Sequence, residues 1–303
     1  MSKTVLITGG SGLVGSRISE FLLKKNYKVR WLSRKGGNKG DIEVFEWNVE
    51  KGEIDVSSLE GTDFIIHLAG AGVADKKWTK ERKRDIKESR INSTKLLKQT
   101  LEQNEHNVKA FISASAVGYY GWNSGGVWKK EESRFGDDFL ATVTKGWEAE
   151  VDEVATLGIR TVKLRIGIVL SEKGGALKEL SKPIKMGAGA ALGSGDQYMS
   201  WIHLDDLSNM FIYAVEKEDI SGIYNAVGPD PVTNKELSQQ TAKVLGKPFF
   251  LPNVPGFVMK MMLGEMASMV LGGSRVSSEK ITEAGFKFDF PKLKPALEDL
   301  LKG

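Results

Sequence analysis

The segment TVLITGGSGLVGSR, residues 4–17, decides the fold that this chain of 303 residues is expected to take. Its first five residues have an apolar strand pattern, and glycines at positions 9, 12 and 15 follow before apolar residues recur at helical spacing. In this setting the first glycine allows a tight turn, the second lets backbone N–H groups approach a pyrophosphate, and the third lets the helix pack closely. The segment therefore predicts a dinucleotide site with contacts from Gly9, Ser11, Gly12, Leu13, Val14 and Gly15.

Strand-like and helix-like segments alternate along the N-terminal half of the chain. Strand patterns occur at residues 4–8, 27–33, 43–47, 63–70, 109–115 and 160–170, and helical patterns at residues 13–25, 80–103 and 139–157. This alternation is typical of a parallel sheet with helices on both faces. The sequence therefore predicts an α/β fold, a doubly wound parallel sheet of the Rossmann type with a smaller α/β region at its C-terminal end.

The composition of the sequence and the length of its regular segments change after about residue 170. Glycine-rich stretches such as MGAGAALGSGD interrupt shorter segments, and the run GFVMKMMLGEMASMVLGG is rich in methionine. We therefore expect a dinucleotide-binding domain over residues 1–170, completed by a strand near residues 222–227. A smaller substrate-side region is expected over residues 171–303.

Composition narrows the classes of function. The 43 basic and 39 acidic residues leave a formal charge of +4 spread along the chain, which is not the pattern of a nucleic-acid binder. The chain has no cysteine and three histidines, so no disulfide framework and no metal site is expected. No apolar run resembles a signal peptide or a membrane span. We expect a cytoplasmic protein with a small-molecule substrate and no nucleic-acid or membrane partner, for which a homodimer is compatible with the sequence.

The residues at the end of the second predicted strand indicate which dinucleotide binds. NAD-binding chains usually place an acidic residue there, whereas this chain has Ser33 and Arg34. A guanidinium can pair with a 2′-phosphate, and a serine hydroxyl can add a hydrogen bond. NADP(H) is therefore the predicted cofactor. The alternative is that Arg34 is a solvated loop arginine without a role in binding. Asn48, after the next strand, is expected either at the adenine edge or in a turn.

Small residues follow the fourth predicted strand, in HLAGAG, residues 67–72. A bulky side chain there would block a dinucleotide that crosses the sheet edge. We therefore expect cofactor contacts from Leu68, Ala69 and Gly70. His67 is interpreted as a side chain packed inside the strand.

Several motifs, distributed in order along the chain, resemble a known family. They are TGGSGLVG, HLAG, ESRINSTKLL, SAVGYYG, GWEAE, LRIGIVLSEKGGAL and GSGDQYMSWIHLDD, followed by a tail over residues 253–301. Together they resemble the extended short-chain dehydrogenase/reductase superfamily, and within it the atypical nucleotide-sugar-epimerase-like subgroup that includes the bacterial cell-division-inhibitor-like proteins. The resemblance implies an NADP-dependent Rossmann fold, an epimerase-like substrate region and a short C-terminal segment particular to the subgroup.

The resemblance also implies catalytic residues. Members of the superfamily transfer hydride with the help of a serine, a tyrosine that exchanges the proton, and a lysine that lowers the pKa of the tyrosine. Ser115 stands at the serine position. The glutamate of GWEAE selects Lys145 as the lysine and places Ala141 where the tyrosine belongs, while a slip of one residue would bring Gly146 to the position of the base. A methyl group cannot donate a proton, so the acid must come from elsewhere.

Residues from the loop after Ser115, the long helix and a later strand complete the predicted site. Tyr119 and Tyr120 lie in a loop expected over the cleft, where either one is the proton donor or both form its walls. Lys145 keeps a predicted contact with the cofactor ribose. The resemblance places Arg90 beside the cofactor, against the alternative of a solvated helix face, and it places Ile168, with Arg165, near the nicotinamide end.

Two functions of different class follow. The first is an NADP(H)-dependent oxidoreductase or epimerase that acts on a nucleotide-sugar-like substrate or on another hydroxyl or carbonyl compound, and Ser115 with the tyrosine pair favours it. The second is a non-catalytic NADP(H)-binding regulatory protein, which Ala141 favours. Of the two functions, the sequence favours the first, the NADP(H)-dependent enzyme.

Overall fold

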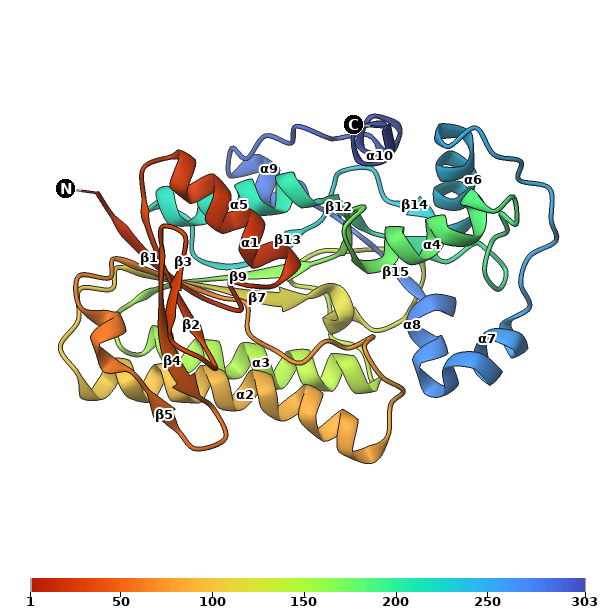
Figure 1. Cartoon of the computed structure of the whole chain (residues 1–303). Coiled ribbons are helices and arrows are strands. Elements are labelled where there is room, and N and C mark those ends of the chain that lie inside the picture. Colours follow the sequence, from red (N-terminus) through yellow and green to blue (C-terminus); the bar gives the residue numbers. More distant parts are fainter. Residues whose placement is uncertain (1, 303) are drawn as a thin grey trace.

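The computed structural model describes residues 2–302, with the side chains of residues 123 and 124 outside the description. The described residues form one sheet of nine strands, in the order β13-β9-β7-β6-β1-β2-β4-β3, with β5 paired to β4 (Figure 1). These strands are β1 Thr4–Thr8, β2 Lys28–Ser33, β3 Gly37–Lys39, β4 Ile42–Asn48, β5 Glu53–Ile54, β6 Phe64–His67, β7 Ala110–Ala116, β9 Arg160–Ile166 and β13 Gly222–Ala226. All neighbours from β13 to β4 are parallel, and β3 and β5 pair with β4 in the antiparallel sense.

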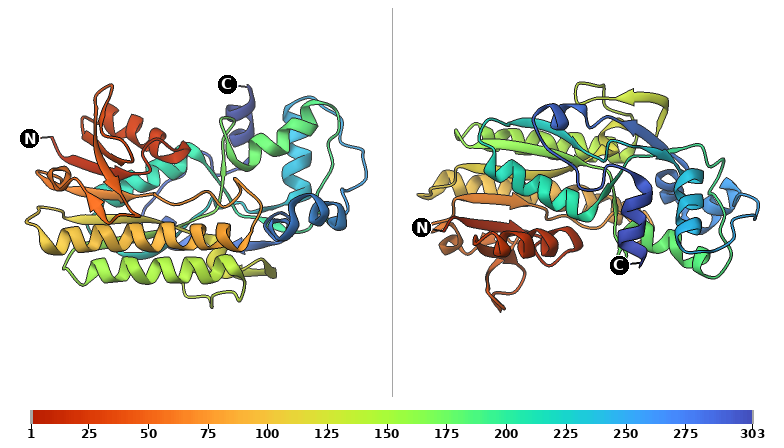
Figure 2. Two further views of the ribbon diagram at one scale, coloured as in Figure 1. Left: turned by 60° about the horizontal axis from the view of Figure 1, so that its bottom comes forward. Right: turned by 90° about the horizontal axis from the view of Figure 1, so that it is seen from above.

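Helices cover both faces of this sheet. On one face α2 (Lys80–Gln103) lies beside α3 (Phe139–Ala155), and on the other α1 (Leu13–Lys24) lies beside α5 (Leu204–Glu216), as Figures 1 and 2 show. The two short turns of helix η1 (Val56–Leu59) and η2 (Val117–Tyr120) follow β5 and β7. The prediction of a doubly wound parallel sheet is confirmed.

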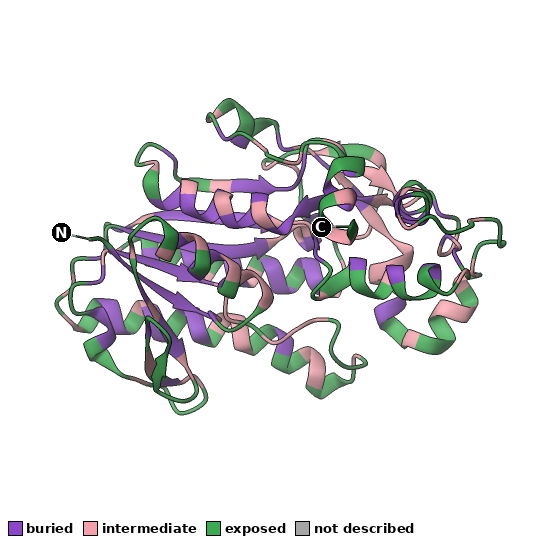
Figure 3. Cartoon of the chain, turned by 45° about the horizontal axis from the view of Figure 1, so that its top comes forward, coloured by how far each residue is buried: buried purple, intermediate pink, exposed green. Residues whose placement is uncertain are grey.

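The centre of the sheet is fully buried, which explains its continuous apolar strands. Every residue of β1 is buried, and Figure 3 shows the central strands as the most buried part of the chain. The chain leaves β1 for β2 on one side and later returns as β6 on the other side. This reversal opens a crevice at the carboxyl ends of β1 and β6, where ligands of such sheets bind.

The segment 160–170, expected as a single strand, is divided at Gly167. The Gly167 N–H donates to the carbonyl of Ala226 over 3.1 Å, whereas the next N–H, of Ile168, donates to the carbonyl of Ser200 over 2.8 Å. A Cβ at Gly167 would overlap the Ser200 carbonyl oxygen. Gly167 therefore lets the chain change partners, and β10 (Ile168–Leu170) pairs in parallel with β12 (Trp201–His203).

The C-terminal part of the chain has a small core of its own, built around the fully buried Trp201. Its further elements are α4 Gly175–Lys185, β11 Tyr198–Met199, β14 Val232–Thr233, α6 Asn234–Val244, α7 Gly256–Leu263, η3 Gly264–Met266, α8 Ala267–Leu271, β15 Gly273–Val276, α9 Glu279–Glu283 and α10 Leu293–Lys302. Strand β15 returns to the first half of the chain and pairs with β8 (Asn123–Lys129). The domain division near residue 170 stays a prediction. No helix in residues 2–302 is long and apolar enough to span a bilayer.

Candidate functional site

A cavity of about 940 Å³ lies at the carboxyl ends of β1, β2, β4 and β6. The glycine turn forms its floor. Gly9 has a φ of 69°, in the left-handed region that favours glycine, and its carbonyl accepts the N–H of Gly12 over 3.0 Å. A Cβ at Gly15 would overlap the Gly9 carbonyl oxygen, so only glycine lets α1 approach the turn this closely. The predicted contacts that line this cavity are Gly9, Ser11, Ser33, Arg34, Asn48, Ala69 and Gly70, and Gly12, Leu13, Val14 and Gly15 lie at the adjoining start of α1.

Two arginines give the larger cavity its positive groups. Arg34 is exposed and forms no ion pair with any carboxylate in the described part of the chain. Arg82 donates from Nη2 to the Gly72 carbonyl over 2.5 Å, and its buried Nε has no hydrogen-bond partner among the described residues. Asn48 accepts the N–H of Lys51 over 3.1 Å, so it closes a turn while it also lines the cavity.

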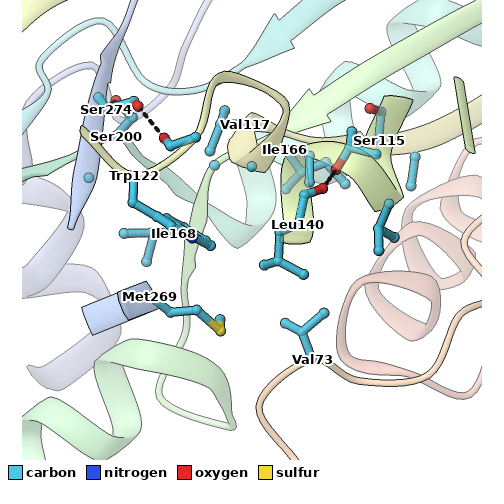
Figure 4. Close-up of a pocket in the computed structure, with 18 of the residues that line it drawn as sticks. Val73, Ser115, Val117, Trp122, Leu140, Ile166, Ile168, Ser200, Met269 and Ser274 are labelled. Atoms are coloured by element: carbon cyan, nitrogen blue, oxygen red, sulfur yellow. Dashed lines mark hydrogen bonds between the residues drawn. The ribbon is translucent and has the colours of Figure 1, made fainter. Parts of the chain in front are cut away.

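A second cavity, of about 350 Å³, lies farther along the sheet edge. Its walls come from the end of β7, from η2, α3 and the turn between β9 and β10, and from α8 and β15 of the C-terminal tail. Figure 4 shows Val73, Leu140 and Met269 pointing into this space from three separate segments.

The two cavities adjoin. Leu68 lines the smaller one, and the next two residues, Ala69 and Gly70, line the larger one. Arg90 lines the smaller cavity at the same place, since a Cβ at Gly70 would lie 3.1 Å from its side chain. The linings of the two cavities therefore meet at residues 68–70, on the same edge of the sheet.

Ser115 lines the smaller cavity and connects it to a buried ionic network. Its hydroxyl donates to Oε1 of Glu148 over 2.6 Å. Arg165 holds the same carboxylate with two hydrogen bonds, of 2.7 Å from Nε and 2.8 Å from Nη2. Both charged side chains are almost fully buried, so they are stable only as a pair.

The structure does not bring Tyr119 or Tyr120 to the smaller cavity. The Tyr120 hydroxyl donates to Oδ1 of Asn225 over 2.7 Å and accepts from Nη1 of Arg165 over 2.9 Å. Burial raises the pKa of Tyr120 to about 12. The Tyr119 ring lies against the Arg165 guanidinium, with 3.4 Å between the centre of the ring and Cζ of Arg165. Both rings therefore pack around Arg165, which also lies deeper than its expected place at the nicotinamide end.

The structure does not bring Lys145 or Ala141 to the smaller cavity. Lys145 is exposed, and its Nζ lies 3.9 Å from the centre of the Phe135 ring, so it lines neither cavity. Ala141 is fully buried in the core. The helix presents Leu140 and Thr144 to the smaller cavity, four residues apart, which is the spacing of the superfamily's tyrosine and lysine. Neither of these two side chains performs the expected proton chemistry.

Arg90 and Ile168 line the smaller cavity, on the side that adjoins the larger one. Nη1 of Arg90 donates to the carbonyls of Ala71 over 3.0 Å and of Ile86 over 2.8 Å, and its guanidinium lies over the Trp147 ring. Burial lowers the pKa of Arg90 to about 10. His67 is fully buried and contacts Thr8 through Nδ1 over 2.7 Å, as expected for a packed side chain.

Sequence reasoning missed several residues that line the cavities. One face of α2 contributes Arg82, Asp85, Glu88, Ser89, Asn92 and Ser93 to the larger cavity. The three-and-four spacing of these polar residues was the available signal, and the basic run around them concealed it. Tyr198, on β11, lines the smaller cavity, and no spacing in the sequence connects it with Ser115.

Two models of known protein families match the chain. A model of the NAD dependent epimerase/dehydratase family matches residues 5–226. The chain belongs to this family. A second model, a domain of unknown function (DUF1731), matches residues 254–300, which is the tail expected over residues 253–301. The resemblance stated from the sequence motifs is confirmed.

Relatives from distant organisms match over nearly the whole chain. The epimerase family protein YfhF of Bacillus subtilis is 34% identical over 98% of this chain and 97% of its own length. The structure of the human epimerase family protein SDR39U1 (isoform 2) with NADPH has a TM-score of 0.88, 29% identity and 99% coverage of both chains. A nucleoside-diphosphate sugar epimerase from Corynebacterium glutamicum has a TM-score of 0.81 and 30% identity, over 99% of this chain and 58% of that one.

Proposed function

We propose that the protein binds NADP(H) in the larger cavity and works as an oxidoreductase or epimerase on a hydroxyl or carbonyl compound held in the smaller cavity. The observation that carries the proposal is that consecutive residues line the two cavities, Leu68 the smaller one and Ala69 and Gly70 the larger one, with Ser115 in the wall of the smaller one. When bound, the cofactor would supply or accept a hydride at its nicotinamide ring.

The residues around the larger cavity fit such a cofactor. The free N–H groups at the start of α1 suit a pyrophosphate, and the exposed Arg34 suits a 2′-phosphate. The buried Nε of Arg82 has no partner among residues 2–302, and a phosphate oxygen would supply one. The presence of NADPH in the human SDR39U1 structure supports the same choice.

Ser115 would orient the substrate. Because its proton is donated to Glu148, the oxygen is left to accept a hydrogen bond from a substrate hydroxyl. Arg165 holds the Glu148 carboxylate in place with two hydrogen bonds, so the serine is held in one orientation. Tyr198 is the tyrosine that lines this cavity within the described residues, and it replaces Tyr119 and Tyr120 as the proposed proton donor.

The alternative is a non-catalytic NADP(H)-binding regulatory protein. Leu140 and Thr144 favour it, because they line the smaller cavity from α3 at the spacing of the superfamily's tyrosine and lysine. Such a protein would keep the larger cavity and use cofactor binding alone. A cytoplasmic location and a homodimer, both expected from the sequence, stay predictions.

Cofactor binding tests the first half of the proposal. NADPH and NADH are titrated into the wild type, Arg34→Ala and Arg134→Ala, and binding is followed by nucleotide fluorescence. Arg134 is a matched control because it is exposed and lines neither cavity. Arg34→Ala should weaken NADPH by about tenfold or more and NADH little, since the lost group pairs with the 2′-phosphate. Equal losses for both nucleotides would remove this assignment.

Turnover tests the second half. NADPH oxidation is followed with a panel of carbonyl compounds and sugar nucleotides, using the wild type, Tyr198→Phe and the control Tyr119→Phe. Loss of a positioned acid should lower the rate by about a hundredfold in Tyr198→Phe, whereas Tyr119→Phe should stay near the wild type. Tight NADPH binding without turnover of any compound would favour the regulatory protein instead.

A further inference from the structure

We propose that the smaller cavity takes a compact, largely apolar carbonyl or hydroxyl compound, not a nucleotide sugar, and that the C-terminal tail supplies the wall that makes it so. The inference rests on the proposed function of this cavity as the substrate site. It concerns the class of substrate, which the family membership leaves open.

The lining of the smaller cavity is mainly aliphatic and aromatic. Leu68, Val73, Val117, Leu140, Val143 and Met269 all contribute to it. Burying apolar atoms against such a surface favours binding, whereas a sugar ring brought there would lose hydrogen bonds to water. The cavity therefore favours a hydrocarbon body.

Three hydroxyl groups in the wall already have partners, whereas Nε1 of Trp147 has none among the described residues. The hydroxyl of Ser200 donates to the Ser274 carbonyl and that of Ser274 to the Gly121 carbonyl, each over 2.7 Å (Figure 4). The Thr144 hydroxyl donates to the Leu140 carbonyl over 2.8 Å. These groups offer no free donors to a row of sugar hydroxyls. Tyr198 can donate to the single oxygen of a ketone, and Ser115 can accept from the hydroxyl of an alcohol.

The smaller cavity offers a diphosphate one cationic side chain among the described residues. Arg90 is the charged side chain that lines it within the described residues, and its Nη1 is committed to the carbonyls of Ala71 and Ile86. A nucleoside diphosphate needs charge-assisted hydrogen bonds to its phosphates. The larger cavity offers such groups in Arg34 and Arg82. The volume of the smaller cavity, about 350 Å³, is near the lower limit of about 300 Å³ for small-molecule sites.

The tail closes the smaller cavity on the side away from the cofactor. Met269 of α8 and Gly272, Gly273 and Ser274 at the start of β15 form this wall. The wall is closely packed at its two glycines, since a Cβ at Gly272 would lie 2.5 Å from Cβ of Trp122 and one at Gly273 would overlap the Tyr198 carbonyl oxygen. The segment matched by the domain of unknown function thus has a role in substrate selection.

Calorimetric titration of the full-length protein, with and without saturating NADP⁺, tests the inference. The ligands are methyl heptyl ketone, benzylacetone and UDP-glucose. We expect both ketones to bind the wild type and UDP-glucose not to bind. Met269→Lys puts an ammonium group into the cavity and should weaken ketone binding by about tenfold or more. Met261→Lys is the matched control, because Met261 is 75% exposed on α7.

NADP⁺ affinity serves as the check on folding, and it should be unchanged in both variants. UDP-glucose binding in place of the ketones, or ketone binding that Met269→Lys leaves intact, would overturn the inference. If NADP⁺ binds and neither ketone does, the inference fails and the proposed cofactor site stands. If the ketones bind a wild-type chain that does not bind NADP⁺, the apolar site stands and the proposed function fails.

Discussion

Single residues decide how the proposed site is held, and Glu148 is the clearest case. Its carboxylate accepts three hydrogen bonds, one from Ser115 and two from Arg165, in a buried setting. Glu148→Gln removes the negative charge and leaves the buried guanidinium of Arg165 unpaired. The free energy of unfolding should fall by about 3 kcal/mol or more, measured by urea unfolding at neutral pH.

Glu150→Gln on the same helix is the control for that substitution. Its carboxylate pairs with Nζ of Lys95 over 3.5 Å, with the lysine side chain 53% exposed. Such a pair contributes about 0.5 kcal/mol, so the control should unfold close to the wild type. Similar losses in the two variants would contradict the importance given to the buried pair.

Asp206 gives a pH-dependent prediction. It accepts the N–H groups of Asp289 over 2.7 Å and Phe290 over 3.1 Å, and burial raises its pKa to about 6. Since the carboxyl titrates near 3.9 in an unfolded chain, the folded state holds the proton more tightly between these pH values. The contribution of Asp206 to the free energy of unfolding therefore falls as the pH rises.

Urea unfolding of the wild type and Asp206→Asn at pH 4.5 and 7.5 measures this contribution. The wild-type free energy of unfolding minus that of the variant should decrease by about 2 kcal/mol between the two pH values. A difference that is constant with pH, or that increases, would show that the pKa of Asp206 is not raised in the folded protein.

The residue scale also shows where the sequence could and could not be interpreted correctly. Buried positions on α3 are spaced by three and four residues, and this pattern already predicts that Lys145 faces outward. Alignment with the family motif instead placed Lys145 beside the cofactor. The helical periodicity was the better guide to the direction of this side chain. The contact between Ser115 and Glu148 could not be predicted, because the packing of α3 on β7 brings together residues 33 positions apart.

At the scale of elements, the glycine turn and α1 are the parts that sequence predicts best. Strand, turn and helix are contiguous there, so local spacing determines the geometry. The face that α2 presents to the larger cavity was harder to predict, because exposed and cavity-lining polar residues look alike in a sequence. The break at Gly167 depends on Ala226 and Ser200, which are distant in the chain.

Gly15→Ala tests the close approach of α1 to the turn. The added Cβ would overlap the Gly9 carbonyl oxygen, so the start of α1 must move away from the turn. NADPH affinity, measured by fluorescence titration, should fall by about tenfold or more. Ser16→Ala is the control, because Ser16 is exposed and its hydroxyl only donates to the Leu13 carbonyl. Unchanged affinity in Gly15→Ala would mean that the turn is not part of the cofactor site.

At the scale of the whole molecule, the tail is integrated into the fold instead of standing apart from it. Strand β15 pairs with β8, and Asp206 of α5 holds the backbone at Asp289 and Phe290. The change in composition near residue 170 predicted a domain boundary. The contacts that cross this boundary are long-range, and no local sequence pattern indicates them. The smaller cavity depends on them, because its outer wall is made of tail residues.

The same integration predicts cooperative unfolding. Leu297 of α10 is fully buried in the small core with Trp201 and Leu237. Leu297→Ala leaves a cavity there and should lower the free energy of unfolding by about 2 to 5 kcal/mol, whereas Lys294→Ala, exposed on the same helix, should change it little. Because the tail contacts the main sheet region, unfolding followed by tryptophan fluorescence and by far-ultraviolet circular dichroism should shift together. Two separate transitions in Leu297→Ala would instead show that the tail unfolds independently, and the wall of the smaller cavity would then be lost before the cofactor site.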